Sequence, residues 1–240
     1  MKSEHYIFFS TQIKDDIIIL NKEECKHAYS VLRYNKATPI KITDGKGHFY
    51  ECKFIQNTPE GAIFSIINII KVPAPNKNIN VFIGLNEKEP FAETCEILSS
   101  IGVNFIYPVI CEYCQNPWWK SWEKHYLRIQ KKMISGIKQA KNPWLPILLK
   151  PLKFDEALLS LKENFILVAE EKGNSVFKIW DNIKDEKNIS CFVGPPGGFS
   201  SKEKNILTSY SSFFISLSPN RLRTEIASVV LIGLISALSI

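Results

Sequence analysis

The segment Gly194–Ser200 reads Gly-Pro-Pro-Gly-Gly-Phe-Ser and follows the apolar run Ile189–Val193. A glycine turn between a buried strand and a helix is a common phosphate site. The spacing matches neither G-x-x-x-x-G-K-[ST] nor G-x-G-x-x-G, and Pro195 and Pro196 have no N–H group to donate to a phosphate. The sequence therefore argues against a nucleotide phosphate. It leaves open a loop whose glycines admit a flat ligand close to the backbone, or a plain strand-to-helix turn.

A second segment that could carry chemistry is Leu217–Glu225, which contains Arg221 and Arg223 in a chain with only four arginines. Thr224 is placed to cap a following helix, with Glu225 in its first turn. Cations are mildly unfavourable at a helix N-terminus, so an anionic partner would offset their cost. The alternative is a pair of surface charges beside a capped helix.

Weaker signals lie elsewhere in the chain. Cys111 and Cys114 have the spacing of a zinc or redox motif, but no second pair lies near them in the sequence, and we expect no metal. His27 is read as a surface or capping histidine rather than a base. A basic stretch could contact RNA phosphates or form a solvated helix face. Its cations are Lys120, Lys124, Arg128, Lys131, Lys132, Lys138 and Lys141.

The segment after residue 78 predicts a parallel α/β sheet. Strand-like runs alternate with helical patterns, which is typical of a parallel sheet covered by helices on both faces. Ligands of such sheets bind at the carboxyl ends of the strands, where Gly194–Ser200 and Leu217–Glu225 would lie. The expected strands are Ile79–Ile83, Asn104–Val109, Pro146–Leu149, Phe165–Ala169, Ile189–Val193 and Phe213–Ser216.

The segment before residue 71 predicts a small β-barrel, because short β patterns dominate it. Asn21 is expected to cap a helix that runs through Leu32. The sequence Asp-Gly-Lys-Gly from Asp44 predicts a hairpin turn. The expected strands are Tyr6–Phe9, Ile17–Leu20, Pro39–Thr43, His48–Ile55 and Gly61–Ile70, and a short linker covers residues 71–78.

Composition sets the outer limits. The 240 residues are 45% hydrophobic and 22% charged, which excludes wholesale disorder, collagen and coiled-coil arrays. The net charge of +6 is compatible with a polyanionic partner without requiring one. Scattered cysteines and an N-terminus without a signal peptide predict a cytoplasmic protein with reduced thiols. Residues 226–240 are uncharged but shorter than the roughly 20 residues that span a bilayer, so we expect a buried helix and no membrane anchor.

Several segments in register resemble the RsmE family, the 16S ribosomal RNA (uridine-N3) methyltransferases of the SPOUT superfamily. Residues 27–33 and 44–50 resemble its His-x-x-x-Val-Leu-Arg and Asp-Gly-x-Gly-x-x-Tyr patterns. Residues 194–200 and 217–225 resemble its Gly-Pro-x-Gly-Gly-Phe-Ser and Leu-x-Pro-x-Arg-Leu-Arg-Thr-Glu patterns. Their order covers the chain from Tyr6 to Leu238, which makes the set far more specific than any one motif.

The resemblance implies a PUA-like β-barrel RNA-binding domain over residues 1–72. It implies a SPOUT methyltransferase domain over residues 73–240, with a parallel α/β sheet and a C-terminal trefoil knot. It further implies S-adenosylmethionine as cofactor, the 16S rRNA of the small ribosomal subunit as substrate, and a homodimer. The expected cofactor-binding residues are Ala169, Glu170, Gly194, Pro195, Gly197, Gly198, Leu217, Ser218, Asn220 and Leu222.

Arg223 and Glu225 are the expected catalytic residues. Uridine N3 carries a proton and becomes a good nucleophile only when that proton leaves, so a fixed guanidinium near O2 or O4 would stabilise the developing anion. Glu225 would orient this group or accept the proton, although water could equally be the base. The expected RNA-binding residues are His27, Arg33, Lys131, Lys138 and Arg221.

The chain departs from the family pattern in several places. Pro196 stands where the family has Glu, and residues 86–90, Tyr113 and Asn142 replace other polar family residues, among them the Arg of Glu-Arg-Ser. Two alternatives therefore stay open: a non-catalytic RNA-binding or ribosome-assembly protein that keeps the fold, and a ribose 2′-O-methyltransferase. We favour a divergent active enzyme because Arg221, Arg223 and Glu225 are all present.

Overall fold

The computed structural model describes residues 6–31, 35–161 and 165–237. The chain forms two compact units. The first contains Met1–Ala74 and Ile134–Leu145, and the second contains Pro75–Met133 and Pro146–Ile240. The division after Ala74 falls within the linker expected from two prolines and polar residues.

The first unit is built on a six-stranded mixed sheet in the order β1-β4-β5-β6-β3-β2. Among the described strand pairs of this sheet, only β1–β4 is parallel. Its core contains Phe8, Ile18, Leu20, Ile42 and Phe64. The strands are β1 (Ile7–Phe9), β2 (Ile13–Lys14), β3 (Ile17–Asn21), β4 (Ile40–Thr43), β5 (His48–Thr58) and β6 (Gly61–Lys71).

Local signals in this unit act as the sequence predicts. The Asn21 side chain accepts a hydrogen bond of 2.9 Å from the Glu24 amide at the start of α1 (Lys22–Lys26). That helix continues as a π-helix over His27–Val31, where the sequence predicted one regular helix. Asp44 is buried and accepts hydrogen bonds from the Lys46 amide and the Tyr50 hydroxyl, which closes the expected turn.

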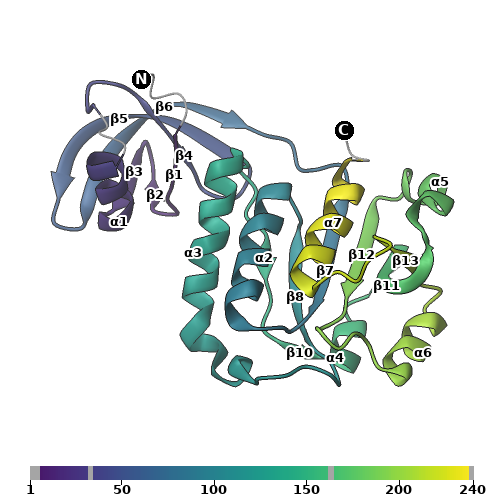
Figure 1. Cartoon of the computed structure of the whole chain (residues 1–240). Helices are drawn as coiled ribbons and strands as arrows, with labels where there is room; N and C mark the ends of the chain where they lie inside the picture. Colours follow the sequence, from purple (N-terminus) through teal and green to yellow (C-terminus); the bar gives the residue numbers. More distant parts are fainter. Residues whose placement is uncertain (1–5, 32–34, 162–164, 238–240) are drawn as a thin grey trace. The chain divides into compact units, whose positions relative to one another are not determined.

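The second unit holds a seven-stranded parallel sheet in the order β10-β8-β7-β12-β11-β13, with β9 paired to β8 (Figure 1). The strands are β7 (Asn78–Gly84), β8 (Phe105–Ile110), β9 (Ile147–Leu148), β10 (Leu152–Lys153), β11 (Phe165–Ser175), β12 (Asn188–Val193) and β13 (Phe213–Ser216). Strand β11 is longer than expected because its pairing with β13 shifts register between Ala169 and Asn174.

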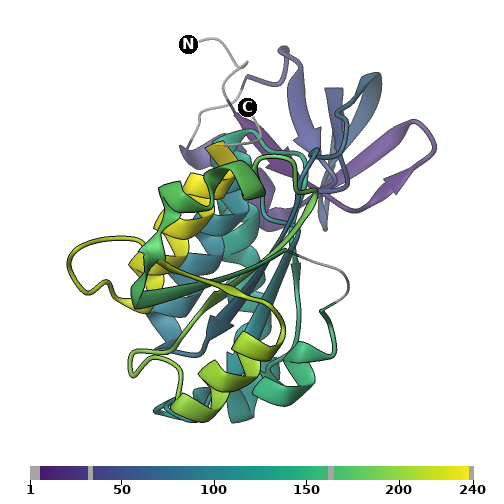
Figure 2. The same ribbon diagram turned by 90° about the vertical axis from the view of Figure 1, so that its right-hand side faces the viewer.

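Helices cover both faces of this sheet, as predicted. Helices α2 and α7 lie side by side over one face (Figures 1 and 2). On the other face, Phe154 of α4 and Leu207 of α6 pack in a core with Phe82 and Phe192 of the strands. The helices are α2 (Lys88–Ile101), α3 (Trp122–Ala140), α4 (Phe154–Leu158), α5 (Trp180–Ile183), α6 (Ser201–Ser209) and α7 (Thr224–Ala237), with 3-10 turns at Trp118–Ser121 and Val176–Lys178.

The α/β class with a preceding β-rich unit is thus confirmed, whereas the trefoil knot stays a prediction. Helix α7 is largely apolar and buries Leu231, Ile232 and Ile235 in its unit. Among the described residues, no helix combines the length and apolarity that a membrane crossing requires.

Candidate active site

A cavity of about 710 Å³ opens at the carboxyl ends of the parallel strands of the second unit. Ala169 on β11 lies beside Val193 on β12, and Val193 lies beside Ile83 on β7. The loops that follow these strands therefore leave the sheet along one edge. Cavities of several hundred Å³ at this edge are the usual ligand sites of parallel α/β folds.

The glycine loop after β12 forms one wall. The Gly198 amide donates a hydrogen bond of 2.7 Å to the Pro195 carbonyl, and Gly198 has a φ of +74°. Gly84, at the end of β7, lies so close that a Cβ there would be 2.3 Å from the Pro195 nitrogen. Gly84 thus lets the glycine loop approach β7. Gly84 was not among the predicted site residues, although a glycine at the end of a predicted buried strand was a usable signal.

The loop between β13 and α7 is tied to the glycine loop by two hydrogen bonds. The Arg221 guanidinium donates to the Pro196 carbonyl at 2.7 Å, and the Thr224 hydroxyl donates to the Gly194 carbonyl at 2.9 Å. The N-cap role predicted for Thr224 is wrong. Helix α7 begins at Thr224, and the Ala227 amide bonds to the Arg223 carbonyl, so the hydroxyl is directed to the neighbouring loop instead.

The third wall comes from the register shift in β11. Glu170 forms an ion pair of 2.8 Å with Lys204 of α6, and its side chain is 20% exposed. Gly173 packs so tightly on β13 that a Cβ would lie 2.5 Å from the backbone carbon of Ile215. The extra residues of β11 therefore project Glu170 and Glu171 into the cavity wall.

The expected catalytic pair lies at the start of α7. The Arg223 side chain is 86% exposed, and its guanidinium nitrogen is 3.8 Å from a carboxylate oxygen of Glu225. The other Glu225 oxygen accepts a hydrogen bond of 3.3 Å from the Asn86 amide group. Asn86 Oδ1 is buried and has no hydrogen-bond partner in the described part of the chain. The Trp118 indole donates to the Asn86 carbonyl at 2.9 Å, so Asn86 holds Glu225 from a fixed position.

The cavity brings together every residue predicted to hold the cofactor and both predicted catalytic residues. Arg221, predicted to contact RNA, also lines the cavity. Residues that the sequence did not assign to the site complete the lining. They are Asn86, Glu87, Pro90, Glu171, Val193, Pro196, Phe199, Lys204, Ser216, Thr224 and Ala227.

The remaining predicted RNA-binding residues do not line this cavity. His27 is exposed on the π-helix of the first unit, and Arg33 lies outside the described residues. Lys131 lies on α3 in the second unit. Lys138 forms an ion pair of 2.6 Å with Glu24 in the first unit. Their contribution to RNA binding stays a prediction.

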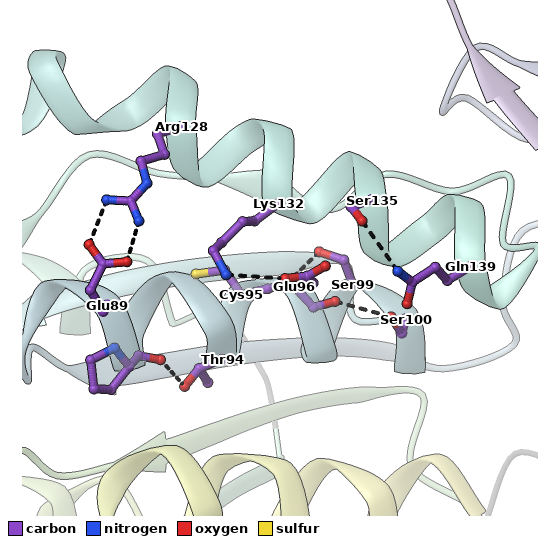
Figure 3. Close-up of polar contacts among 11 residues, drawn as sticks. Glu89, Thr94, Cys95, Glu96, Ser99, Ser100, Arg128, Lys132, Ser135 and Gln139 are labelled. Atoms are coloured by element: carbon purple, nitrogen blue, oxygen red, sulfur yellow. Dashed lines mark hydrogen bonds and ion pairs between the residues drawn. The ribbon is translucent and has the colours of Figure 1, made fainter. Parts of the chain in front are cut away.

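The basic helix α3 is partly neutralised by α2 (Figure 3). The Arg128 guanidinium donates through both terminal nitrogens to the Glu89 carboxylate, and these hydrogen bonds lower the pKa of Glu89. Lys132 lies 3.4 Å from Glu96. Because these cations already have carboxylate partners, they are less available to phosphates than the sequence suggested.

The cysteine pair sits in the turn after β8. The Cys111 amide donates to the Cys114 sulfur at 3.2 Å. A hydrogen bond from the Cys111 thiol lowers the pKa of Cys114. The same hydrogen bond, together with burial, raises the pKa of Cys111. The described residues contain no group of three or more His, Cys, Asp or Glu side chains that could hold a metal ion.

Family comparison agrees with this geometry. Residues 73–236 match the model of the RNA methyltransferase domain. The chain belongs to this RNA methyltransferase family. Residues 20–67 match the model of the RNA methyltransferase PUA domain, which places that module in the β-rich first unit. Both matches confirm the resemblance drawn from the motifs.

Three relatives of this RNA methyltransferase span nearly the same length. A protein named ribosomal RNA small subunit methyltransferase E, from Aquifex aeolicus, is 25% identical over 96% of this chain and 98% of its own. A Borreliella burgdorferi protein named ribosomal RNA small subunit methyltransferase E 1 is 28% identical over 88% of this chain and 89% of its own. The crystal structure of a Neisseria gonorrhoeae ribosomal RNA small subunit methyltransferase E bound to S-adenosylmethionine shares the fold, with a TM-score of 0.85, 22% identity and 97% coverage of both chains.

Proposed function

We propose that this chain is an S-adenosylmethionine-dependent methyltransferase that acts on N3 of a uridine in the 16S rRNA of the small ribosomal subunit. The observation that carries the proposal is the cavity in which the glycine loop, the β11 loop and the Arg221–Glu225 segment meet. The names of the Aquifex aeolicus and Borreliella burgdorferi relatives support ribosomal RNA of the small subunit as the substrate.

The residues present fit the adenosyl cofactor. Two prolines deprive the glycine loop of the amides that a phosphate cradle needs, and among the described residues no atom beyond its chain neighbours lies within 4 Å of the place where a Cβ of Gly198 would stand. A thin ligand can therefore lie directly against this backbone. When bound, S-adenosylmethionine supplies a methyl group activated by a sulfonium. We assign its binding to the residues predicted from the resemblance, all of which line the cavity.

Arg223 would stabilise negative charge on the uracil as N3 loses its proton, because its exposed guanidinium stands at the cavity. Glu225 would orient Arg223 or accept the proton, and Asn86 would hold Glu225 in place. Arg221 would contact a phosphate or the cofactor side. The loops would hold the uracil and the methyl donor next to each other, which makes a bimolecular step effectively unimolecular.

The proposal includes an RNA-binding domain over residues 1–72, a methyltransferase domain over residues 73–240, and a homodimer in the cytoplasm. On α7, Ile226 is 48% exposed, and no described atom outside the helix's own backbone lies within 4 Å of a Cβ placed on Gly233. An apolar helix face with open space beside it suits a two-fold mate. Sedimentation of a stable monomer at micromolar concentration would contradict the dimer.

Mass spectrometry of 16S rRNA from a strain that lacks this gene tests the function. We expect loss of one N3-methyluridine and its restoration by the purified protein with S-adenosylmethionine. Calorimetry on the same preparation should show cofactor binding. A pure RNA-binding or assembly protein would bind RNA without taking up the cofactor. A lost 2′-O-methyl group in place of N3-methyluridine would identify the ribose methyltransferase.

A further inference from the structure

Tyr113 lies beside the cavity without being part of its lining. It follows β8, whose Val109 pairs with Gly84 of β7, so its turn leaves the sheet at the edge where the cavity opens. A Cβ on Gly197 would lie 2.8 Å from the Tyr113 Cβ and 3.4 Å from two ring carbons. The side chain thus packs directly on the glycine loop, and it is 44% exposed. An exposed aromatic ring next to a ligand cavity is available to a molecule that approaches the opening.

The turn that carries Tyr113 is held at both ends. The Cys111 amide donates to the Cys114 sulfur, and the Cys114 amide donates to the Cys111 carbonyl at 3.1 Å. Between them, the Glu112 amide donates to one carboxylate oxygen of Glu203 at 2.9 Å. These contacts fix the backbone on either side of the tyrosine.

Glu203 also ties this turn to the glycine loop. Its carboxylate is buried, and its second oxygen accepts a hydrogen bond of 2.8 Å from the Ser200 amide, directly after that loop. One side chain therefore bonds to the backbone of both segments, so the position of Tyr113 relative to Gly197 is set by buried contacts. A ring placed in this way loses little freedom when a flat ligand stacks on it.

A cation contacts the same glycine loop as the ring. Arg221 donates to the Pro196 carbonyl at 2.7 Å, one residue before Gly197, and is itself exposed. An aromatic ring and a guanidinium that contact adjacent residues of one loop match the parts of a nucleotide, a base and a phosphate. Single-stranded RNA is recognised through this combination of stacking and backbone charge.

We propose that Tyr113 is a stacking residue for a nucleobase of the RNA substrate, at the opening of the cofactor cavity. The inference rests on the proposed methyl transfer to RNA, because N3 of a uridine is reachable only when its base is unpaired and turned toward the cavity. Stacking on Tyr113 would hold that base, or its neighbour, in place while Arg221 contacts the backbone. Since Tyr113 lies outside the cavity lining, it should affect the RNA and leave the cofactor alone.

Kinetics with small ribosomal subunits from a strain lacking the gene test this role. Tyr113→Ala should lower kcat/KM for the subunit by roughly 5- to 100-fold, which is the range of base–aromatic stacking, and leave S-adenosylmethionine affinity unchanged. Tyr113→Phe should retain activity. Tyr113→Leu, which keeps apolar contact with Gly197 but cannot stack as a ring, should behave like Tyr113→Ala. The matched control is Tyr210→Ala, because Tyr210 is also 44% exposed and lies outside the cavity lining.

Photo-crosslinking distinguishes direct contact between Tyr113 and RNA from a role of Tyr113 in packing alone. A 16S rRNA transcript containing 5-iodouridine should crosslink to Tyr113 in the wild-type protein, and Tyr210→Ala should leave that crosslink intact. Full activity in Tyr113→Leu, weakened cofactor binding in Tyr113→Ala, or a crosslink pattern without Tyr113 would overturn the proposal. If the wild-type protein transfers no methyl group, the proposed function fails, and crosslinking still decides whether Tyr113 contacts a base.

Discussion

The hydroxyl of Thr224 donates a hydrogen bond of 2.9 Å to the carbonyl oxygen of Gly194. This contact joins the first residue of α7 to the first residue of the glycine loop, thirty positions earlier in the chain. Thr224 is buried, although it also lines the cavity. Two cavity walls that are distant in sequence are held together at this point.

Thr224→Val should therefore weaken the cofactor site. The change leaves the Gly194 carbonyl without its partner at a cost of about 1–3 kcal/mol, and we expect roughly a 5- to 100-fold loss of S-adenosylmethionine affinity by calorimetry. Thr208→Val is the control, because within the described chain the Thr208 hydroxyl bonds inside α6, to the Lys204 carbonyl, on an exposed face. Equal affinity in both variants would show that this hydrogen bond does not shape the site.

Gly198 should tolerate only residues that accept a positive φ. Its φ of +74° is unfavourable for a β-branched side chain, so Gly198→Val should abolish cofactor binding. Asn adopts this conformation more readily, and Gly198→Asn should keep measurable binding. Calorimetry gives the affinities, and melting temperatures show that both variants fold. Binding by Gly198→Val at wild-type affinity would contradict this assignment.

Arg223 should matter for turnover more than for RNA affinity. Its removal takes away a charge needed only as N3 becomes an anion, so Arg223→Ala should lower single-turnover methylation by roughly a hundredfold or more. Filter binding at fixed salt should change little, because RNA affinity is spread over many phosphate contacts. Arg223→Lys should rescue poorly, since a point charge does not reproduce a planar fork.

The control for Arg223 is Lys202→Ala, which removes an exposed cation from α6 and should leave methylation unchanged. Wild-type turnover in Arg223→Ala would show that Arg223 does not stabilise the uracil anion, and the family assignment would be unaffected. A pure RNA-binding protein would instead show weaker binding in Arg223→Ala and no turnover in any form of the chain.

Cys114 should be the most reactive of the thiols in the described residues. The Cys111 thiol donates to its sulfur and lowers the pKa of Cys114, whereas burial raises the pKa of Cys95 and Cys191. Because the pKa of Cys114 is lowered, its thiolate persists as the pH falls below the ordinary thiol range, and alkylation by iodoacetamide should continue there. In Cys111→Ala the pKa of Cys114 should rise, and the rate at which iodoacetamide alkylates Cys114 at pH 7 should fall. Peptide mass spectrometry across a pH series measures both, and preferential labelling of Cys95 would contradict the pKa order.

Much of this molecule was predictable from local sequence. Alternating apolar runs and helical patterns predicted the parallel sheet of the second unit, because side-chain periodicity follows backbone geometry. Turn chemistry predicted the glycine loop and the closed turn at Asp44. The position of the site followed from one topological rule, since loops after parallel strands meet at one edge. The sequence therefore places Gly194, Gly198, Arg221 and Glu225 at a common edge of the sheet.

Other features depended on contacts between residues far apart in the chain. The Lys77 ammonium donates to the carbonyls of Ile183, Lys184 and Glu186, more than a hundred positions away, although its own surroundings read as a polar linker. Residues 134–145 group with the first unit, although the sequence pattern continues them from the second. Asn86 holds Glu225, and Tyr113 packs on Gly197. A sequence pattern records which face of an element is apolar, but it does not record which distant backbone lies opposite, because packing and strand register alone decide that.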